Sequence, residues 1–194
     1  IRSRILVVSL LLTAVSSLPS VTSADTTITG EKLGAFFRIT VPDNWNGDLV
    51  INNHGFDFNP PTSVPAGGLG PLAALMLSEG YAVAASSYSN CCWTLWSTQQ
   101  DLNRLVGVFE ANFGPPNNVI LHGGSLGGIV TAQGVEKLGS NVIGAYPICG
   151  ALAGSRSWDG APDLRLTYDV ICAGVAGGTL PGGATGLPSP GFPP

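Results

Sequence analysis

Apolar and polar positions follow a regular succession along the chain. Short, continuous apolar runs alternate with segments in which apolar residues recur every three or four positions. From residue 48 onward this predicts the order strand, helix, strand, helix, strand, helix, strand. The predicted strands cover residues 48–56, 81–89, 118–122 and 141–152, and the predicted helices cover residues 71–79, 97–113 and 126–138.

The helical pattern is clearest between residues 97 and 113. Ser97 and Gln100 have the spacing of a capping box, which predicts that the helix begins there. Gly114 and the two prolines after it predict its end. One stripe of apolar side chains is expected to face the core: Leu102, Leu105, Val106 and Phe109.

Continuous apolar strands alternating with helices predict the fold class. It is α/β, with a mostly parallel sheet that carries helices on both faces. Two short β segments are expected before it, within residues 26–42. After residue 152 the pattern fades to one or two helical turns, and 7 Gly and 5 Pro fill 12 of the last 21 positions. We therefore expect a core over residues 25–152 and a lid-like or disordered segment over residues 153–194.

The first 24 residues have the layout of a secretory signal peptide. Arg2 and Arg4 precede an apolar run over residues 5–15, and small residues precede Asp25. A membrane anchor is the alternative, but a spanning helix needs about 20 apolar residues, which is longer than this run. The layout predicts a secreted protein, extracellular or periplasmic, with no membrane span in the mature chain.

The composition limits the classes of partner and cofactor that we expect. The chain has 194 residues, a formal net charge of −4 and only 10% charged residues. It has no basic cluster beyond its start, so nucleic acid is not an expected partner. Two histidines far apart in the sequence and no Cys-x-x-Cys pattern make a poor ligand set, so no metal and no cofactor is expected. The oligomeric state is left open.

Four cysteines allow three pairings, and export would permit disulfides. Cys91 and Cys92 are adjacent, and a bond between neighbouring residues is expected to be strained. We therefore predict one bridge between Cys149 and Cys172. Free buried thiols are the alternative, above all for Cys91 and Cys92.

The stretch Gly123-Gly124-Ser125-Leu126-Gly127 fits the pattern G-x-S-x-G. It follows a predicted strand and opens a predicted helix, as a nucleophile elbow requires. Ser125 would lie in a strained backbone conformation, and the glycines on either side would leave room for the sharp turn. A plain or phosphate-binding glycine turn is the alternative. The glycine spacing does not fit G-x-G-x-x-G, and no lysine follows as in a P-loop.

Together with "NHGF" at residues 53–56 and the strand–helix order, "HGGSLGG" gives a resemblance to the α/β-hydrolase superfamily over about residues 34–152. Within it the chain resembles secreted esterases and lipases, and looks cut short after the strand that follows the nucleophile helix. The resemblance implies a catalytic Ser125, and an oxyanion hole formed by the backbone N–H groups of Phe56 and Leu126. It implies a small-molecule ester as substrate. A peptidase on the same fold and a non-catalytic relative remain alternatives.

The activating partners of Ser125 are not evident. In this fold the order along the chain is serine, acid, histidine, and no histidine follows Ser125. His122 is too close in sequence and His54 is expected on the oxyanion side, so a structural role is favoured for both. No triad acid can be assigned among Glu136, Asp159, Asp163 and Asp169. We expect the acid and the base after Pro194, and a chain without them to be inactive or nearly so.

The substrate is predicted only coarsely. Low charge favours an apolar or aromatic ester over a charged one. Four aromatic residues are expected in loops near the strand ends, where they could contact a substrate or simply pack: Phe58, Tyr88, Trp93 and Trp96.

Overall fold

The computed structural model describes residues 25–62, 68–139 and 141–175. The predicted signal peptide over residues 1–24 lies outside the described residues, as does most of the Gly/Pro-rich tail. Within them one six-stranded sheet forms the centre of the molecule, in the order β1-β2-β4-β3-β5-β6. The strands are β1 Thr26–Lys32, β2 Ala35–Val41, β3 Asp48–Asn53, β4 Ala82–Ser86, β5 Asn118–Gly124 and β6 Val142–Ile148.

The sheet is parallel where the sequence predicts it. Pairs β3–β4, β3–β5 and β5–β6 are parallel, while β1–β2 and β2–β4 are antiparallel. The two predicted β segments before the core are thus a hairpin at one edge of the sheet. At the other edge lies β6, which pairs on one side only, with β5.

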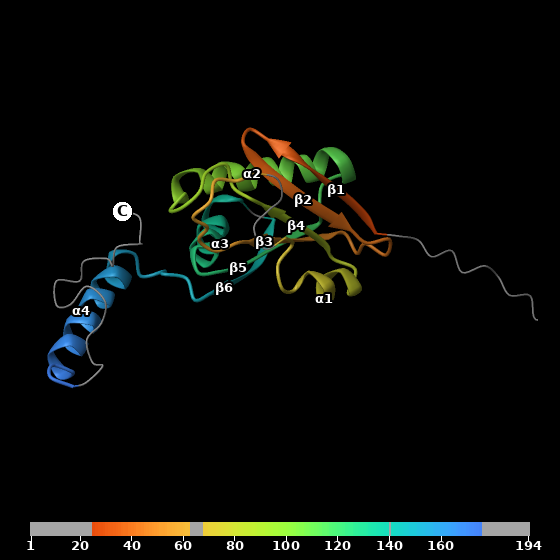
Figure 1. Cartoon of the computed structure of the whole chain (residues 1–194). Helices are drawn as coiled ribbons and strands as arrows, with labels where there is room; N and C mark the ends of the chain where they lie inside the picture. Colours follow the sequence, from red (N-terminus) through yellow and green to blue (C-terminus); the bar gives the residue numbers. More distant parts are fainter. Residues whose placement is uncertain (1–24, 63–67, 140, 176–194) are drawn as a thin grey trace, which may run out of the picture.

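Helices cover both faces of the sheet. Helices α2 (Leu95–Phe113) and α3 (Leu126–Lys137) pack beside each other on one face, and the short α1 (Ala73–Ser78) lies on the other (Figure 1). The predicted stripe of α2 faces the core, since Leu102, Leu105 and Phe109 are buried and Val106 packs partly buried against them. The predicted fold class is confirmed.

The start of α2 differs from the prediction. The helix begins at Leu95, and its N-cap Thr94 makes no side-chain cap bond. Ser97 lies inside the first turn, where its hydroxyl meets the Thr94 hydroxyl at 2.7 Å. The predicted capping box of Ser97 and Gln100 is wrong, because the helix has already begun when the chain reaches Ser97.

Residues after β6 form more structure than the sequence predicts. Helix α4 (Ser155–Ile171) is 17 residues long, with Pro162 inside it. Pro162 and Gly160 lower the helical expectation, which is why only a turn or two was predicted. Figure 1 shows α4 lying apart from the sheet. Its apolar side chains are exposed, among them Leu164, Val170 and Ile171.

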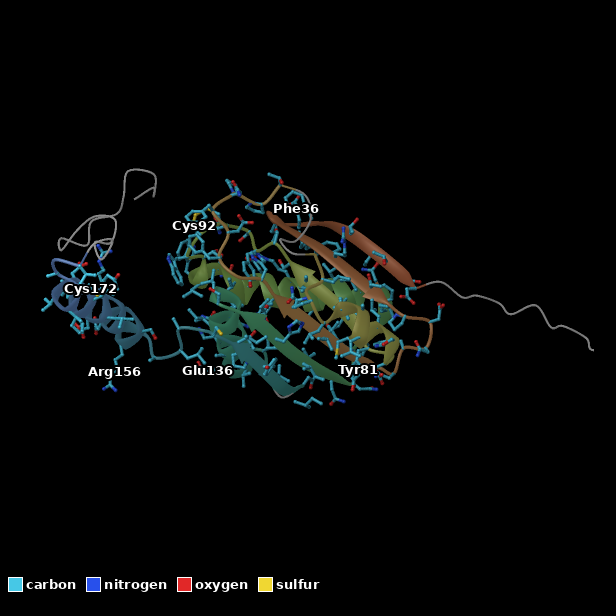
Figure 2. All side chains as sticks on the ribbon, turned by 60° about the horizontal axis from the view of Figure 1, so that its bottom comes forward. Phe36, Tyr81, Cys92, Glu136, Arg156 and Cys172 are labelled. Carbon is cyan, nitrogen blue, oxygen red and sulfur yellow. A yellow bond between two sulfur atoms is a disulfide. The ribbon has the colours of Figure 1, made fainter. Side chains whose placement is uncertain are left out.

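The cysteines pair differently from the prediction. Cys91 is bonded to its neighbour Cys92, while Cys149 and Cys172 are free. Cys149 follows β6 and Cys172 caps the far end of α4. A helix of this length separates its ends by about 25 Å, at about 1.5 Å per residue, whereas a disulfide needs Cα atoms within about 7 Å. Figure 2 shows Cys172 on the separate helix and Cys92 on the main body.

Candidate active site

Ser125 lies at the junction where β5 ends at Gly124 and α3 begins at Leu126. Its backbone has φ 57° and ψ −121°, a conformation that residues with a side chain rarely adopt. The Ser125 N–H donates to the Ile148 carbonyl of β6 at 2.8 Å, and the Ser125 carbonyl accepts from the Gly128 N–H at 2.9 Å. The strained turn predicted from the sequence is present, and backbone bonds on both sides hold it.

Glycines let the turn pack directly on β3. A Cβ atom added at Gly123 or Gly127 would collide with the backbone carbonyl of Asn53, the last residue of that strand. One added at Gly128 would lie 2.9 Å from the Cα of Gly150. The N-terminal turn of α3 can therefore approach the sheet only because these positions carry no side chain.

The loop after β3 lies beside Ser125. A Cβ atom at Gly55 would be 3.6 Å from the Cβ of Ser125 and 3.4 Å from the Gly124 carbonyl. Phe56 follows in this loop, and Leu126 is the first residue of α3. Among the described residues, neither the Phe56 N–H nor the Leu126 N–H donates a hydrogen bond to the protein. The two predicted oxyanion donors thus have N–H groups available for a ligand.

His54 is held tightly at the base of this loop. Its Nδ1 lies 2.7 Å from the Gly55 carbonyl, and because a carbonyl only accepts, Nδ1 carries the proton. The ring stacks on Tyr88 at a centroid distance of 4.2 Å. The Tyr88 hydroxyl in turn donates to the His54 carbonyl at 3.1 Å. Burial, and secondarily the nearby Asp101, raises the pKa of Tyr88, so this hydroxyl remains a donor.

His122 lies inside β5 and is 3% exposed. Its Nε2 is buried without a hydrogen-bond partner among the described residues. Burial lowers the pKa of His122, so the ring stays neutral where an exposed histidine would begin to charge. In the part of the chain that the structure describes, no hydrogen bond joins the Ser125 hydroxyl to either histidine.

The acidic residues after Ser125 do not gather around it. Asp159, Asp163 and Asp169 all lie on α4, apart from the sheet (Figure 1). Asp169 pairs with Arg165 at 3.0 Å. Glu136 lies near the C-terminal end of α3, about three helical turns after Ser125. These positions leave the triad acid unassigned, as the sequence does.

Two hollows flank the segment between β4 and α2. The first, of about 440 Å³, has a mixed polar and apolar lining that includes His54, Asp57, Asn59, Tyr88, Cys91 and Cys92. The second, of about 370 Å³, is apolar and is lined by Trp93, Leu95, Ile129, Ala151 and Gly154. Ile129 is one helical turn beyond Ser125, and its N–H lies 3.4 Å from the Ser125 carbonyl.

The four aromatic residues expected in loops fall into two groups. Tyr88 is buried at 1% exposure and belongs to the core, as the packing alternative predicts. Phe58, Trp93 and Trp96 are exposed. Of these, Trp93 lines the apolar hollow, and its ring packs against the ring of Phe56 with 5.6 Å between the ring centroids.

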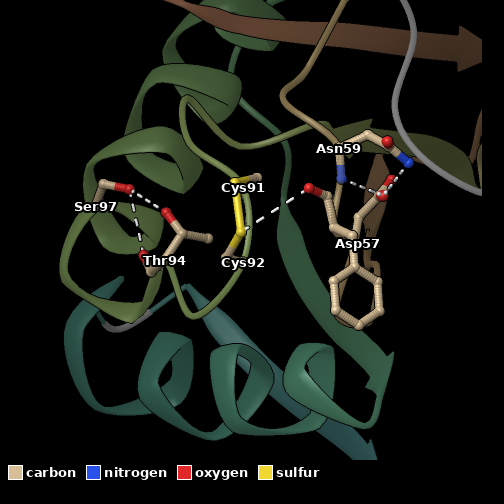
Figure 3. The surroundings of a disulfide bond; sticks show 7 residues. Asp57, Asn59, Cys91, Cys92, Thr94 and Ser97 are labelled. Atoms are coloured by element: carbon tan, nitrogen blue, oxygen red, sulfur yellow. Dashed lines mark hydrogen bonds between the residues drawn. A yellow bond between two sulfur atoms is a disulfide. The ribbon is translucent and has the colours of Figure 1, made fainter. Parts of the chain in front are cut away.

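The disulfide beside the first hollow is a feature of the site that the sequence analysis did not assign. Figure 3 shows Cys91 and Cys92 opposite Asp57 and Asn59 of the loop after β3. The Cys92 N–H donates to the Asp57 carbonyl at 3.0 Å. The adjacency of the two cysteines is the sequence signal for this bond, but the strain expected of it favours the prediction of a Cys149–Cys172 bridge instead.

The described residues contain no group of three or more His, Cys, Asp or Glu side chains arranged to hold a metal ion. No helix in the same residues has the length and hydrophobicity to cross a membrane.

Known proteins were compared with the chain by sequence. No protein-family model matches it. It is 31% identical over 118 residues to the o-phthalyl amidase of Xanthobacter agilis, which corresponds to 59% of this chain and 25% of that protein. The chain therefore spans about a quarter of the length of this curated relative.

Two solved structures match a larger share of this chain. An esterase of Pyrococcus furiosus, Pf2001, matches with a TM-score of 0.53 at 16% identity, over 76% of this chain and 56% of that one. Brefeldin A esterase, described as a bacterial homologue of human hormone-sensitive lipase, matches with a TM-score of 0.50 at 16% identity. That match covers 82% of this chain and 49% of the esterase. The sheet order, the strained serine between β5 and α3 and these matches identify the fold of the chain as that of the α/β-hydrolase superfamily.

Proposed function

We propose that the chain carries the nucleophile of a serine hydrolase that cleaves carboxylic esters. The observation that carries this proposal is the backbone of Ser125, held at φ 57° between β5 and α3 with the loop after β3 against it. Such strain persists only where the surrounding structure enforces it, and it concentrates at functional sites. The esterases of similar fold support the choice of ester chemistry.

In the proposed reaction the Ser125 hydroxyl oxygen attacks the carbonyl carbon of the ester. The N–H groups of Phe56 and Leu126 donate to the negative oxygen of the tetrahedral intermediate. They stabilise it more than the neutral substrate, which lowers the barrier. The intermediate collapses to an acyl-serine and releases the alcohol, and water then frees the acid. A base takes the proton of the Ser125 hydroxyl and passes it to the departing alcohol. Among the described residues, neither His54 nor His122 hydrogen-bonds that hydroxyl.

The test uses the full protein encoded by the gene. Ser125→Ala should lower kcat/KM for a p-nitrophenyl ester by at least about a thousandfold, because the nucleophile is lost. An alkyl fluorophosphonate should label Ser125 of the unmodified protein, with the site identified by mass spectrometry. Absence of both effects would favour the non-catalytic alternative.

Amide hydrolysis is the second candidate, and the 31% identity to an amidase favours it. Both reactions pass through the same tetrahedral intermediate, so the same serine and the same N–H donors would serve. A p-nitrophenyl ester and a p-nitroanilide of one acyl group separate the two. A kcat/KM for the anilide within about tenfold of that for the ester would assign an amidase or peptidase.

We also propose that the protein is secreted, to the extracellular space or the periplasm. The apolar run behind Arg2 and Arg4 supports this, and a disulfide between Cys91 and Cys92 fits an oxidising compartment. N-terminal sequencing of the protein recovered outside the cytoplasm should begin at Asp25. A recovered protein that still carries residues 1–24 would contradict cleavage.

A further inference from the structure

Two loops meet at the first hollow, and one of them lies against Ser125. The loop after β3 runs through residues 54–59 and carries Phe56, and the segment between β4 and α2 runs through residues 87–94 and carries the disulfide. This hollow, of about 440 Å³, is lined by both. The position of the Phe56 N–H therefore depends on how firmly the second segment holds the first.

One contact between the two loops is made at Cys92. Its N–H donates to the Asp57 carbonyl at 3.0 Å. Its Sγ lies 4.0 Å from the Phe58 carbonyl, a packing contact since a bonded sulfur has no proton to donate (Figure 3). Cys92 thus touches the residues on the C-terminal side of Phe56.

The disulfide-bearing segment is itself anchored to the core. The N–H and the hydroxyl of Ser89 donate to Asp101 Oδ2 on α2, at 2.8 and 2.9 Å. The preceding residue, Tyr88, donates from its hydroxyl to the His54 carbonyl. The loop after β3 is therefore tied to this segment on both sides of Phe56, at His54 through Tyr88 and at Asp57 through Cys92.

Cys92 makes its bond from an unusual backbone conformation. Its φ is 66°, in the left-handed region that residues with a side chain rarely adopt. The bond between neighbouring sulfurs closes a small covalent ring that includes the peptide between Cys91 and Cys92. This ring restricts the rotations by which Cys92 would leave that conformation and withdraw its N–H from Asp57.

We propose that the Cys91–Cys92 disulfide is a positioning group for the oxyanion hole. By fixing Cys92 it fixes Asp57, and with Asp57 the neighbouring N–H of Phe56. This inference rests on the proposed function. The aligned N–H matters most in the transition state, so loss of the disulfide should lower kcat while KM changes little.

The experiment uses the full protein with Cys149→Ser and Cys172→Ser, which removes the two cysteines that are free in the structure. A thiol count of the unfolded protein should give no thiol from Cys91 and Cys92 before reduction and two after it. A dithiol supplies the two electrons and two protons, and is itself oxidised to a cyclic disulfide. Ester hydrolysis is measured for the oxidised, reduced and reoxidised protein, and for Cys91→Ser with Cys92→Ser.

Reduction should lower kcat about tenfold to a hundredfold. This decrease should not exceed the decrease in kcat that follows removal of one complete oxyanion donor. KM should stay within about threefold, the double serine variant should match the reduced protein, and reoxidation should restore kcat. Circular dichroism should show the same folded protein throughout.

Three results would overturn the inference. They are an unchanged kcat after reduction, a rise in KM at constant kcat, which would make the disulfide a substrate contact, and a loss of activity that only follows loss of folded protein. Ser125→Ala in the same background separates the two proposals. If it hydrolyses the ester as well as its parent, the proposed function fails; if it is inactive while reduction changes nothing, only the positioning role fails.

Discussion

At the scale of the residue, the absence of a side chain decides how the elbow is built. Gly127 faces the backbone carbonyl of Asn53, which cannot move without disturbing β3. Gly127→Ala should destabilise the protein by about 3 kcal/mol, the upper end of what overpacking costs. Gly107→Ala is the matched control, since this glycine of α2 has nothing within 4 Å of its missing Cβ. It should stabilise by about 0.5–1 kcal/mol. Urea denaturation measures both, and equal stabilities would contradict the packing argument.

His122 gives a prediction about pH. Its pKa is lowered from 6.5 by burial, so below about pH 6.5 the unfolded chain takes up a proton that the folded protein does not. Stability should therefore fall as the pH drops from 6.5 toward the pKa in the folded state, and then level off for this group. His122→Gln should flatten the dependence of unfolding free energy on pH in that window. A slope identical to that of the unmodified protein would show that His122 is not its source.

At the scale of the element, one buried carboxylate joins α2 to the segment that follows β4. The side chain of Asp101 is inaccessible; its Oδ2 accepts two bonds from Ser89 and its Oδ1 pairs with Arg104 at 2.8 Å. Asp101→Asn leaves one oxygen for these partners and removes the charge. It should cost about 1–3 kcal/mol of unfolding free energy. Asp163→Asn, exposed on α4, is the control and should stay within about 0.5 kcal/mol. Thermal unfolding of the pair measures the difference.

The regular elements could be predicted because burial on a sheet or a helix face repeats with a fixed period. The stripe of α2 and the parallel strands β3, β4, β5 and β6 follow from it. The start of α2 does not, since Thr94 caps the helix through its backbone position and not through a side-chain bond. Helix α4 also lies beyond the pattern, because Gly160 and Pro162 interrupt it and its apolar residues face no core.

The site could be predicted only where one local segment defines it. Ser125 and its glycines form one such segment, and the strained turn follows from them. The hydrogen bond from Cys92 to Asp57 joins residues that are 35 positions apart in the sequence. No local sequence pattern marks either residue as a partner in this bond. The sequence does not predict the pairing of Cys91 with Cys92, because adjacency implies strain and the left-handed backbone of Cys92 that accommodates the bond is a tertiary feature.

At the scale of the whole molecule, the two edge strands of the described sheet differ: β1 is mostly polar, whereas β6 exposes large apolar side chains. Strand β6 pairs only with β5, and its Ile143 and Tyr146 are 60% and 61% exposed. An exposed apolar edge strand is a template for pairing with another chain. The 194-residue chain produced by itself should therefore self-associate as its concentration rises. Ile143→Lys should shift the association to concentrations at least about tenfold higher, because a charge at an edge opposes pairing.

The control for this prediction is Leu33→Lys, in the turn between β1 and β2 at the opposite edge of the sheet. Leu33 is 67% exposed, so the two variants add the same charge at similarly open positions. Light scattering coupled to size-exclusion chromatography, over a range of concentrations, follows the mass of both. If Leu33→Lys weakens association as strongly as Ile143→Lys, net charge and not the β6 edge governs it. An effect confined to Ile143→Lys would assign the contact to β6, because Ile143 lies within an edge strand whereas Leu33 lies in a turn.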